Sequence, residues 1–134
     1  MAGYSGTPLL KKLGIKPGFS MFILQAPEGY IDWLSPLPED VLVQRSLKGE
    51  FDFIHLFVKD QQVFEKEFVK SKQHLKKTGM LWISWPKKSS KVPTTLDENI
   101  IREFGLEEGL VDVKVCAVND VWSGLKFVVR LKDR

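Results

Sequence analysis

The pattern of apolar and polar positions changes period along the chain, and these changes locate the predicted strands and helices. Three runs are apolar almost throughout and have the length of a strand: 19–26, 51–58 and 80–85. Such runs are typical of strands covered on both faces. A weaker strand is predicted over 41–46, and two further strands are predicted over 110–118 and 125–131. The chain is therefore expected to contain about six strands.

Apolar residues at helical spacing lie between these strands. Phe64, Phe68 and Leu75 share one stripe of a helix predicted over 61–77. Thr95, with Glu98 three residues later, has the pattern of a capping box that opens another helix. Two short helices are predicted, one after Thr7-Pro8 and one over 30–34.

Alternating strands and helices predict a largely parallel sheet between two helical layers. The link over 119–124 is too short for a crossover helix, so the last two strands are expected to pair antiparallel. Right-handed crossovers leave few arrangements. We predict a three-layer α/β fold with an open sheet of about six strands in the order 2-1-3-4-6-5, mostly parallel, with the last strand antiparallel.

Length and composition indicate an ordinary globular protein. The 134 residues fit one domain over 1–134, with 1–18 as an N-terminal helical extension. Cys116 is the single cysteine, which excludes an intramolecular disulfide and favours a reducing compartment. The longest apolar runs are too short to span a membrane. We therefore expect a cytoplasmic protein with no membrane partner.

Charge is distributed unevenly. The net charge of +3 is too small to indicate a nucleic-acid partner. No acidic residue occurs over 68–96, where seven lysines lie. This run is either a solvated helix face followed by a loop, or an anion site formed by its last three lysines. Those three are Lys87, Lys88 and Lys91.

Several motifs together resemble a family of small bacterial domains of unknown function. They are GYSGTPL over 3–9, KLGIKPG over 12–18, APEGY over 26–30, WPKKS over 85–89, GLVDVKVCAV over 109–118 and WSGLKF over 122–127. The resemblance covers nearly the whole chain. It implies no activity, because the family has none assigned.

The second half, from FDFIHLF over 51–57 to the final hairpin, also resembles a trimmed class I methyltransferase, which has a Rossmann-like fold. That resemblance implies a glycine-rich turn after the first strand and an acidic residue after the second. Here the turn over 25–29 has one glycine and a proline, and Gln44-Arg45-Ser46 occupies the end of the second strand, where no acid occurs. The sequence therefore argues against S-adenosylmethionine, and no cofactor is expected.

No catalytic or metal motif is recognisable. His55 and His74 have no partners at metal-ligand spacing, and His55 is interpreted as a core or edge histidine within a strand. Cys116 lies in an apolar strand and is interpreted as a small buried hydrophobe. The Ser-x-x-Lys pairs at Ser84 and Ser123 lie at strand ends, where positions i and i+3 point to opposite faces. We therefore predict no catalytic and no metal-binding residues.

The topology points to one edge of the sheet as the candidate site. Ligands of open parallel sheets bind beyond the carboxyl ends of the strands. Aromatic rings and lysines there suit a planar anionic ligand, through stacking and charge-assisted hydrogen bonds. The predicted ligand-binding residues are Glu28, Gly29, Trp85, Lys87, Lys88, Ser89, Trp122 and Ser123. The alternative is that both tryptophans are core residues under loops.

Three functions remain open from the sequence. The first is a non-catalytic domain that binds an anionic or nucleotide-like metabolite at this edge. The second is an interaction module for a protein, with nucleic acid the weaker version because the aromatic residues follow a strand-core pattern. The third is an enzyme, for which no sequence motif specifies a reaction.

Overall fold

The computed structural model describes residues 8–134, so Thr7, expected from the sequence to cap the first short helix, and most of the GYSGTPL motif lie outside the described residues. The strands are β1 (Ser20–Leu24), β2 (Leu42–Gln44), β3 (Phe51–Phe57), β4 (Leu75–Pro86), β5 (Leu110–Ala117) and β6 (Trp122–Val129). The α-helices are α1 (Leu9–Leu13), α2 (Tyr30–Leu34), α3 (Gln61–Lys72) and α4 (Glu98–Glu107). Two single-turn 3-10 helices are η1 (Lys88–Ser90) and η2 (Leu131–Asp133).

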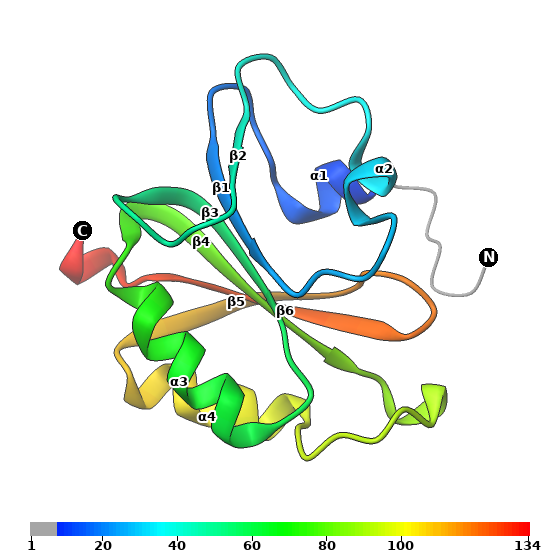
Figure 1. Cartoon of the computed structure of the whole chain (residues 1–134). Coiled ribbons are helices and arrows are strands. Elements are labelled where there is room, and N and C mark those ends of the chain that lie inside the picture. Colours follow the sequence, from blue (N-terminus) through cyan, green and yellow to red (C-terminus); the bar gives the residue numbers. More distant parts are fainter. Residues whose placement is uncertain (1–7) are drawn as a thin grey trace.

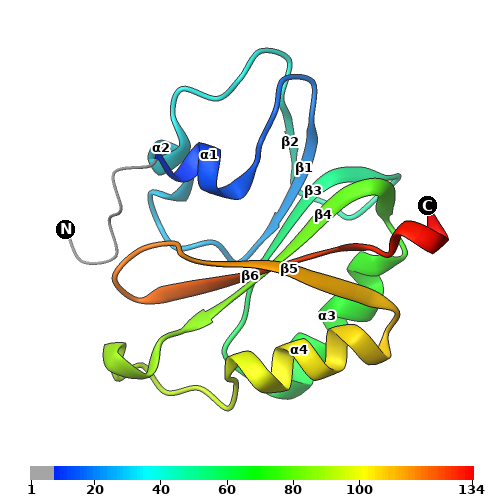
Figure 2. The same cartoon turned by 180° about the vertical axis from the view of Figure 1, so that it is seen from behind.

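The six strands form one mixed sheet in the order β2-β1-β3-β4-β6-β5, which confirms the predicted order. Strands β1 to β4 pair in parallel, and β6 pairs antiparallel with both β4 and β5. Helices α1 and α2 lie on one face of the sheet, and α3 and α4 lie on the other (Figures 1 and 2). The three-layer α/β architecture is therefore as predicted.

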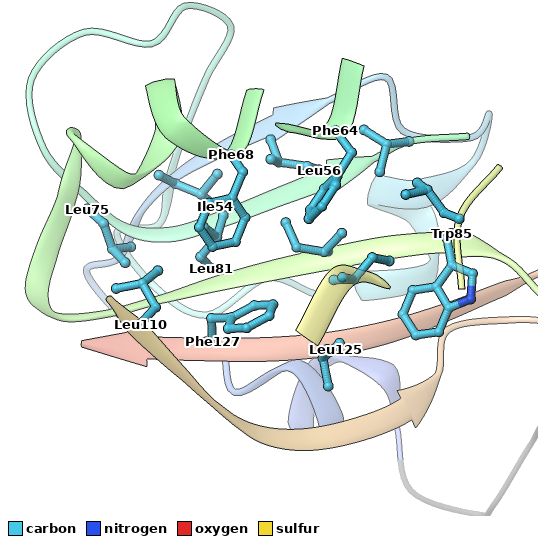
Figure 3. Packing of buried hydrophobic residues seen from close by; sticks show 14 of the residues in the cluster. Ile54, Leu56, Phe64, Phe68, Leu75, Leu81, Trp85, Leu110, Leu125 and Phe127 are labelled. Carbon is cyan, nitrogen blue, oxygen red and sulfur yellow. The ribbon is translucent and has the colours of Figure 1, made fainter. Parts of the chain in front are cut away.

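The larger core lies under α3 and α4. Phe64 and Phe68 from α3 pack edge-on, with ring centroids 5.7 Å apart, and Phe68 packs against Phe127 of β6 at 5.3 Å. These side chains, with Ile54 of β3 and Leu81 of β4, form one continuous apolar layer (Figure 3). Each of the five is fully buried, so the stripe predicted for α3 from Phe64 and Phe68 is its core face.

The second core lies under the two short helices. Leu13 of α1 is fully buried, and its carbonyl accepts a hydrogen bond from Trp82 Nε1 at 3.0 Å. Leu34 of α2 and Phe53 of β3 belong to the same cluster. Because the indole nitrogen of a buried tryptophan needs an acceptor, this bond ties α1 to the centre of the sheet.

Helix α3 ends at Lys72, five residues before the predicted end. Leu75 starts β4 instead of lying on the helical stripe, and it pairs with Phe51. The register shifts between Phe51 and Phe53, and a Cβ at Gly79 would lie 2.9 Å from the Phe51 carbonyl oxygen. The glycine thus lets the irregular start of β4 approach the backbone of β3. Leu75 is therefore in a strand, although its spacing from Phe64 and Phe68 is helical.

Helix α4 begins two residues later than the sequence pattern indicates. Its N-cap is Asp97, whose carboxylate accepts a hydrogen bond from the Ile100 amide at 2.8 Å. The Thr95 hydroxyl instead accepts from the Gln61 amide, at the start of α3, at 2.8 Å. The Thr95 side chain, which local capping rules assign to the start of α4, therefore bonds the start of α3 instead.

Among residues 8–134, no helix is long and apolar enough to cross a membrane.

Candidate functional site

A cavity of about 370 Å³ opens at the carboxyl ends of β1 and β2. Its walls are mostly apolar, with three polar side chains at one side. The lining residues are Ile23, Ala26, Pro27, Gly29, Tyr30, Ile31, Asp32, Val43, Gln44 and Arg45. We call this the β1–β2 cavity. Its volume lies within the range of roughly 300–1,000 Å³ that ligand pockets occupy.

The turn between β1 and α2 lines one part of this cavity. Gln25 and Gly29 both adopt positive φ, 54° and 87°, and Gly29 is the N-cap of α2. A Cβ at Gly29 would lie 3.2 Å from Trp33 Nε1. The glycine is therefore required by its own conformation and by the close indole, and it lets α2 start immediately after the turn.

A second cavity, of about 470 Å³, lies beside the first at the ends of β1 and β3, where the strand order reverses. We call it the β1–β3 cavity. Trp122 and Phe57 pack edge-on in its wall, with ring centroids 5.2 Å apart. Its other lining residues are Gln25, Pro27, Val58, Lys59, Asp60 and Val63. Pro27 lines both cavities, so the turn over 25–29 separates two adjoining spaces.

A buried chain of polar side chains anchors α2 to the sheet. The Tyr30 hydroxyl lies 2.7 Å from His55 Nδ1, and His55 Nε2 lies 2.7 Å from Ser84 Oγ. His55 and Ser84 are fully buried, and Tyr30 is nearly so. Because every polar side-chain atom in this chain has a partner, its burial costs little, and Tyr30 is held where it lines the β1–β2 cavity.

Burial sets the protonation of this chain. It lowers the pKa of His55 to about 3, so the ring is neutral at physiological pH. Burial, with a smaller contribution from nearby Cys116, raises the pKa of Tyr30 well above its usual value. The chain is therefore uncharged near neutrality, and it positions α2 without contributing charge.

Two of the predicted site residues line these cavities: Gly29 lines the β1–β2 cavity and Trp122 lines the β1–β3 cavity. Glu28 lies between them in the turn and is exposed. Trp85 is buried in the core under α3 and α4, on the opposite face from Trp122. The two indoles therefore cannot hold one planar ligand between them.

The lysine-serine segment and the final hairpin do meet at one rim, as the topology predicts. The Lys87 amide donates to the Val121 carbonyl at 2.7 Å. Ser123 pairs with Trp85 across the β4–β6 ladder. Lys88 and Ser89 are exposed in η1. None of these side chains lines either cavity described above.

Sequence reasoning missed the polar wall of the β1–β2 cavity. Asp32 reaches it from α2, while Gln44 and Arg45 reach it from the end of β2. The short helix over 30–34 was predicted, but nothing in the sequence indicates which of its faces turns toward the end of β2. The cavity thus contains a carboxylate after all, supplied by α2 instead of β2.

No group suited to metal or thiol chemistry is found in the described part of the chain. No three His, Cys, Asp or Glu side chains among residues 8–134 gather at metal-binding distance. Cys116 is partly buried against the core under α1, and burial raises the pKa of its thiol. The thiol is therefore protonated near neutral pH, in agreement with its interpretation as a small hydrophobe.

Solved structures share this fold. A SAM-dependent methyltransferase from Aquifex aeolicus has a TM-score of 0.61 at 15% identity, covering 91% of this chain and 88% of that one. The ribosomal protein L11 methylase from Lactobacillus delbrueckii subsp. bulgaricus has a TM-score of 0.60 at 12% identity, covering 91% and 75%. Magnesium protoporphyrin IX methyltransferase from Synechocystis PCC 6803, with bound SAH, has a TM-score of 0.59 at 11% identity, covering 91% and 78%. The fold is that of the methyltransferases.

No family model and no curated protein matches the chain, so the resemblance to small bacterial domains of unknown function is not confirmed.

These comparisons correct two expectations from the sequence. The expected non-catalytic ligand-binding domain is wrong, because the neighbouring structures are methyltransferases and the enzyme alternative fits them better. The expected absence of a cofactor is also wrong, since the neighbours are SAM-dependent or carry bound SAH. The sequence argument considered only glycines after β1 and an acid at the end of β2, whereas the carboxylate that lines the β1–β2 cavity belongs to Asp32 of α2.

Proposed function

We propose that this chain binds S-adenosylmethionine in the β1–β2 cavity and transfers its methyl group to an acceptor in the β1–β3 cavity. The observation that carries the proposal is the position of the two cavities on a methyltransferase fold. Both open at the carboxyl edge of the sheet, on either side of the turn after β1. In open α/β sheets this edge, near the reversal of strand order, is where ligands bind.

The lining of the β1–β2 cavity suits an adenosyl amino acid. Ile23, Ile31 and Val43 offer apolar surfaces on which the adenine ring can pack. The Asp32 carboxylate can accept hydrogen bonds from ribose hydroxyls or from an ammonium group. The Arg45 guanidinium can pair with the carboxylate of the methionine part. The residues present therefore match each portion of the ligand in chemical type.

The β1–β3 cavity suits an acceptor with an apolar or aromatic portion. Trp122, Phe57 and Val63 contribute apolar surface to its wall, and Lys59 also lines it. The carboxylate of Asp60 already accepts a hydrogen bond from the Val63 amide at 3.0 Å, so this acid caps α3. When bound, S-adenosylmethionine supplies a methyl group from its sulfonium to a nucleophilic atom that loses a proton, and S-adenosylhomocysteine is left.

Calorimetric titration with S-adenosylhomocysteine tests the proposal directly, because this product needs no acceptor. We expect binding by the parent protein. Asp32→Asn and Arg45→Gln should each weaken it about tenfold or more, as for the loss of a charge-assisted hydrogen bond. Both side chains are exposed, so neither substitution should impair folding.

Glu50→Gln and Lys48→Gln provide matched controls, since they remove the same charges from the exposed turn between β2 and β3 without lining the cavity. Their affinities should equal that of the parent. No heat of binding from the parent, or equal affinities in all five proteins, would refute the proposal. Phe57 and Trp122 lie outside the β1–β2 cavity, so acceptor binding can be tested separately.

A further inference from the structure

Four lysines that are far apart in the sequence converge beside α1. Lys12 and Lys16 come from α1 and the turn after it, while Lys114 and Lys126 come from β5 and β6. Lys114 and Lys126 stand directly opposite each other in the β5–β6 ladder. Lys114 Nζ lies 2.9 Å from the Lys12 carbonyl oxygen, and a Cβ at Gly14 would lie 3.9 Å from Lys126 Nζ. We call these residues the α1 lysine cluster.

Carboxylates of the described residues pair with several lysines that pack onto the fold elsewhere, but not with three lysines of this cluster. Lys72 pairs with Glu108 at 3.2 Å, and Lys76 pairs with Asp52 at 3.2 Å. Within residues 8–134, Lys16, Lys114 and Lys126 form no salt bridge with any carboxylate. Folding thus pairs three lysines of the acid-free run over 68–96 with carboxylates, namely Lys70, Lys72 and Lys76.

The arrangement of the cluster is unfavourable without an anion. Like charges directly opposite each other on neighbouring strands repel. Lys126 is also half-buried, and its pKa is lowered first by burial and then by Lys114 and Lys16. The Lys12 carbonyl at the end of α1 satisfies only one of the three Lys114 donors. Among residues 8–134, Lys16, Lys114 and Lys126 therefore keep ammonium donors for which the structure provides no carboxylate.

We propose that the α1 lysine cluster binds phosphate groups, and that it does so independently of the adenosyl site. Lysine ammonium groups are compact point charges with rotatable donors, which suits tetrahedral oxyanions. Phosphate oxygens can accept several charge-assisted hydrogen bonds at once, which the single backbone carbonyl cannot. The phosphates can belong to a free polyphosphate or to a nucleic-acid backbone, since both present the same oxygens.

Inorganic triphosphate and a single-stranded RNA oligonucleotide distinguish these two sources. Titration of each at low salt should show binding by the parent protein. Lys114→Gln/Lys126→Gln should weaken that binding at least about tenfold, because two charged contacts are lost. For RNA, the slope of log affinity against log salt should become shallower by about 1.4 in the same variant, at about 0.7 per lost contact.

Lys66→Gln/Lys70→Gln is the matched control. It removes the same charge from α3, on the opposite face of the sheet, and should leave both affinities unchanged. Binding of triphosphate alone identifies a free anion, whereas tighter binding of RNA identifies a nucleic-acid backbone. Absence of both from the parent, or equal loss in the control, would overturn the proposal. Because neither variant alters the adenosyl cavity, S-adenosylhomocysteine titration of the same proteins separates this result from the proposed methyl transfer.

Discussion

His55 is fully buried although its side chain is titratable. It stacks on Phe57 at a centroid distance of 4.2 Å, and both ring nitrogens have hydrogen-bonding partners. The sequence predicts a satisfied core or edge histidine, and the structure confirms this. It does not predict the partners, because Tyr30 and Ser84 lie 25 and 29 residues away on other elements. Only the fold brings the three side chains together.

The buried His55 should make folding stability depend on pH. The unfolded histidine takes up a proton below about pH 6.5, whereas the folded one remains neutral down to about pH 3. The unfolded state therefore binds more protons as the pH falls, and acid destabilises the fold. Across pH 5.5 to 4, His55 should lower the free energy of unfolding by about 1.36 kcal/mol per pH unit.

Urea unfolding of the parent and His55→Gln over this pH range measures the effect. The variant should be less stable at pH 7 but should lose stability less steeply on acidification, because the carboxylates contribute equally to both proteins. His74→Gln is the control: His74 is partly exposed, and its Nδ1 bonds the Gly49 carbonyl. Equal slopes for the parent and His55→Gln would show that the buried ring gains a proton in the fold.

At the scale of the elements, close packing of α4 on β6 depends on one glycine. Gly105 is buried in the last turn of α4, and a Cβ there would lie 2.1 Å from Cε1 of Phe127. The sequence pattern offers Gly105 or Gly109 as the end of this helix, since glycine often follows the last helical turn. The helix continues past Gly105 to Glu107, and Gly109 follows it at a φ of 94°. Gly105 is therefore needed for contact with the sheet and not for termination.

Gly105→Ala should therefore destabilise the protein by about 1–3 kcal/mol, as expected for overpacking. In an exposed helix the same change would stabilise by up to about 1 kcal/mol. Thermal or urea unfolding distinguishes the two signs. Phe127→Leu, which shortens the side chain that the new methyl group meets, should recover part of the loss in the double variant. A stabilising Gly105→Ala would mean that α4 can move away from β6 at little cost.

The sequence predicts elements well where local pattern and tertiary contact agree. Strand order follows from continuous apolar runs and short connections, and these are local properties. The end of α3 could not be predicted, because Leu75 continues the helical spacing while its place in β4 depends on pairing with Phe51. The cap of α4 is similar, since Thr95 is used by the start of α3. The predicted element boundaries are wrong where a residue bonds or pairs with an element that is distant in the sequence.

At the scale of the molecule, the edge that carries the site is predictable and the side chains that line it are not. Topology brings Lys87 and Val121 together, as expected. Alternation along the strands, however, places Trp85 and Trp122 on opposite faces. The positions of the lysines along the sequence likewise do not predict which of them pair with carboxylates. Lys72 and Lys76 form salt bridges, while the lysines beside α1 come together from both ends of the chain.

The helices on the two faces of the sheet differ in length, and the β1–β2 cavity is lined by one of the short helices. Helices α3 and α4 have 12 and 10 residues, whereas α1 and α2 have five each. Strand β2 has three residues at the edge of the sheet, and its Leu42 is 59% exposed. Short elements with few buried residues open more readily than the core. Helix α2 and strand β2, which line the β1–β2 cavity, should therefore be the structured segments that open most readily.

Hydrogen exchange tests this inference together with the ligand. In the free protein, amides of β3 and β4 should exchange slowest, and those of α2 and β2 should exchange much faster through local opening. Saturating S-adenosylhomocysteine should slow exchange over 26–34 and 42–45, because the ligand must be released before these segments open. Helix α3 lies on the other face and should show little added protection beyond any rise in global stability. Ligand protection confined to α3 and α4, with none at α2, would place the bound molecule on the wrong face for the β1–β2 cavity.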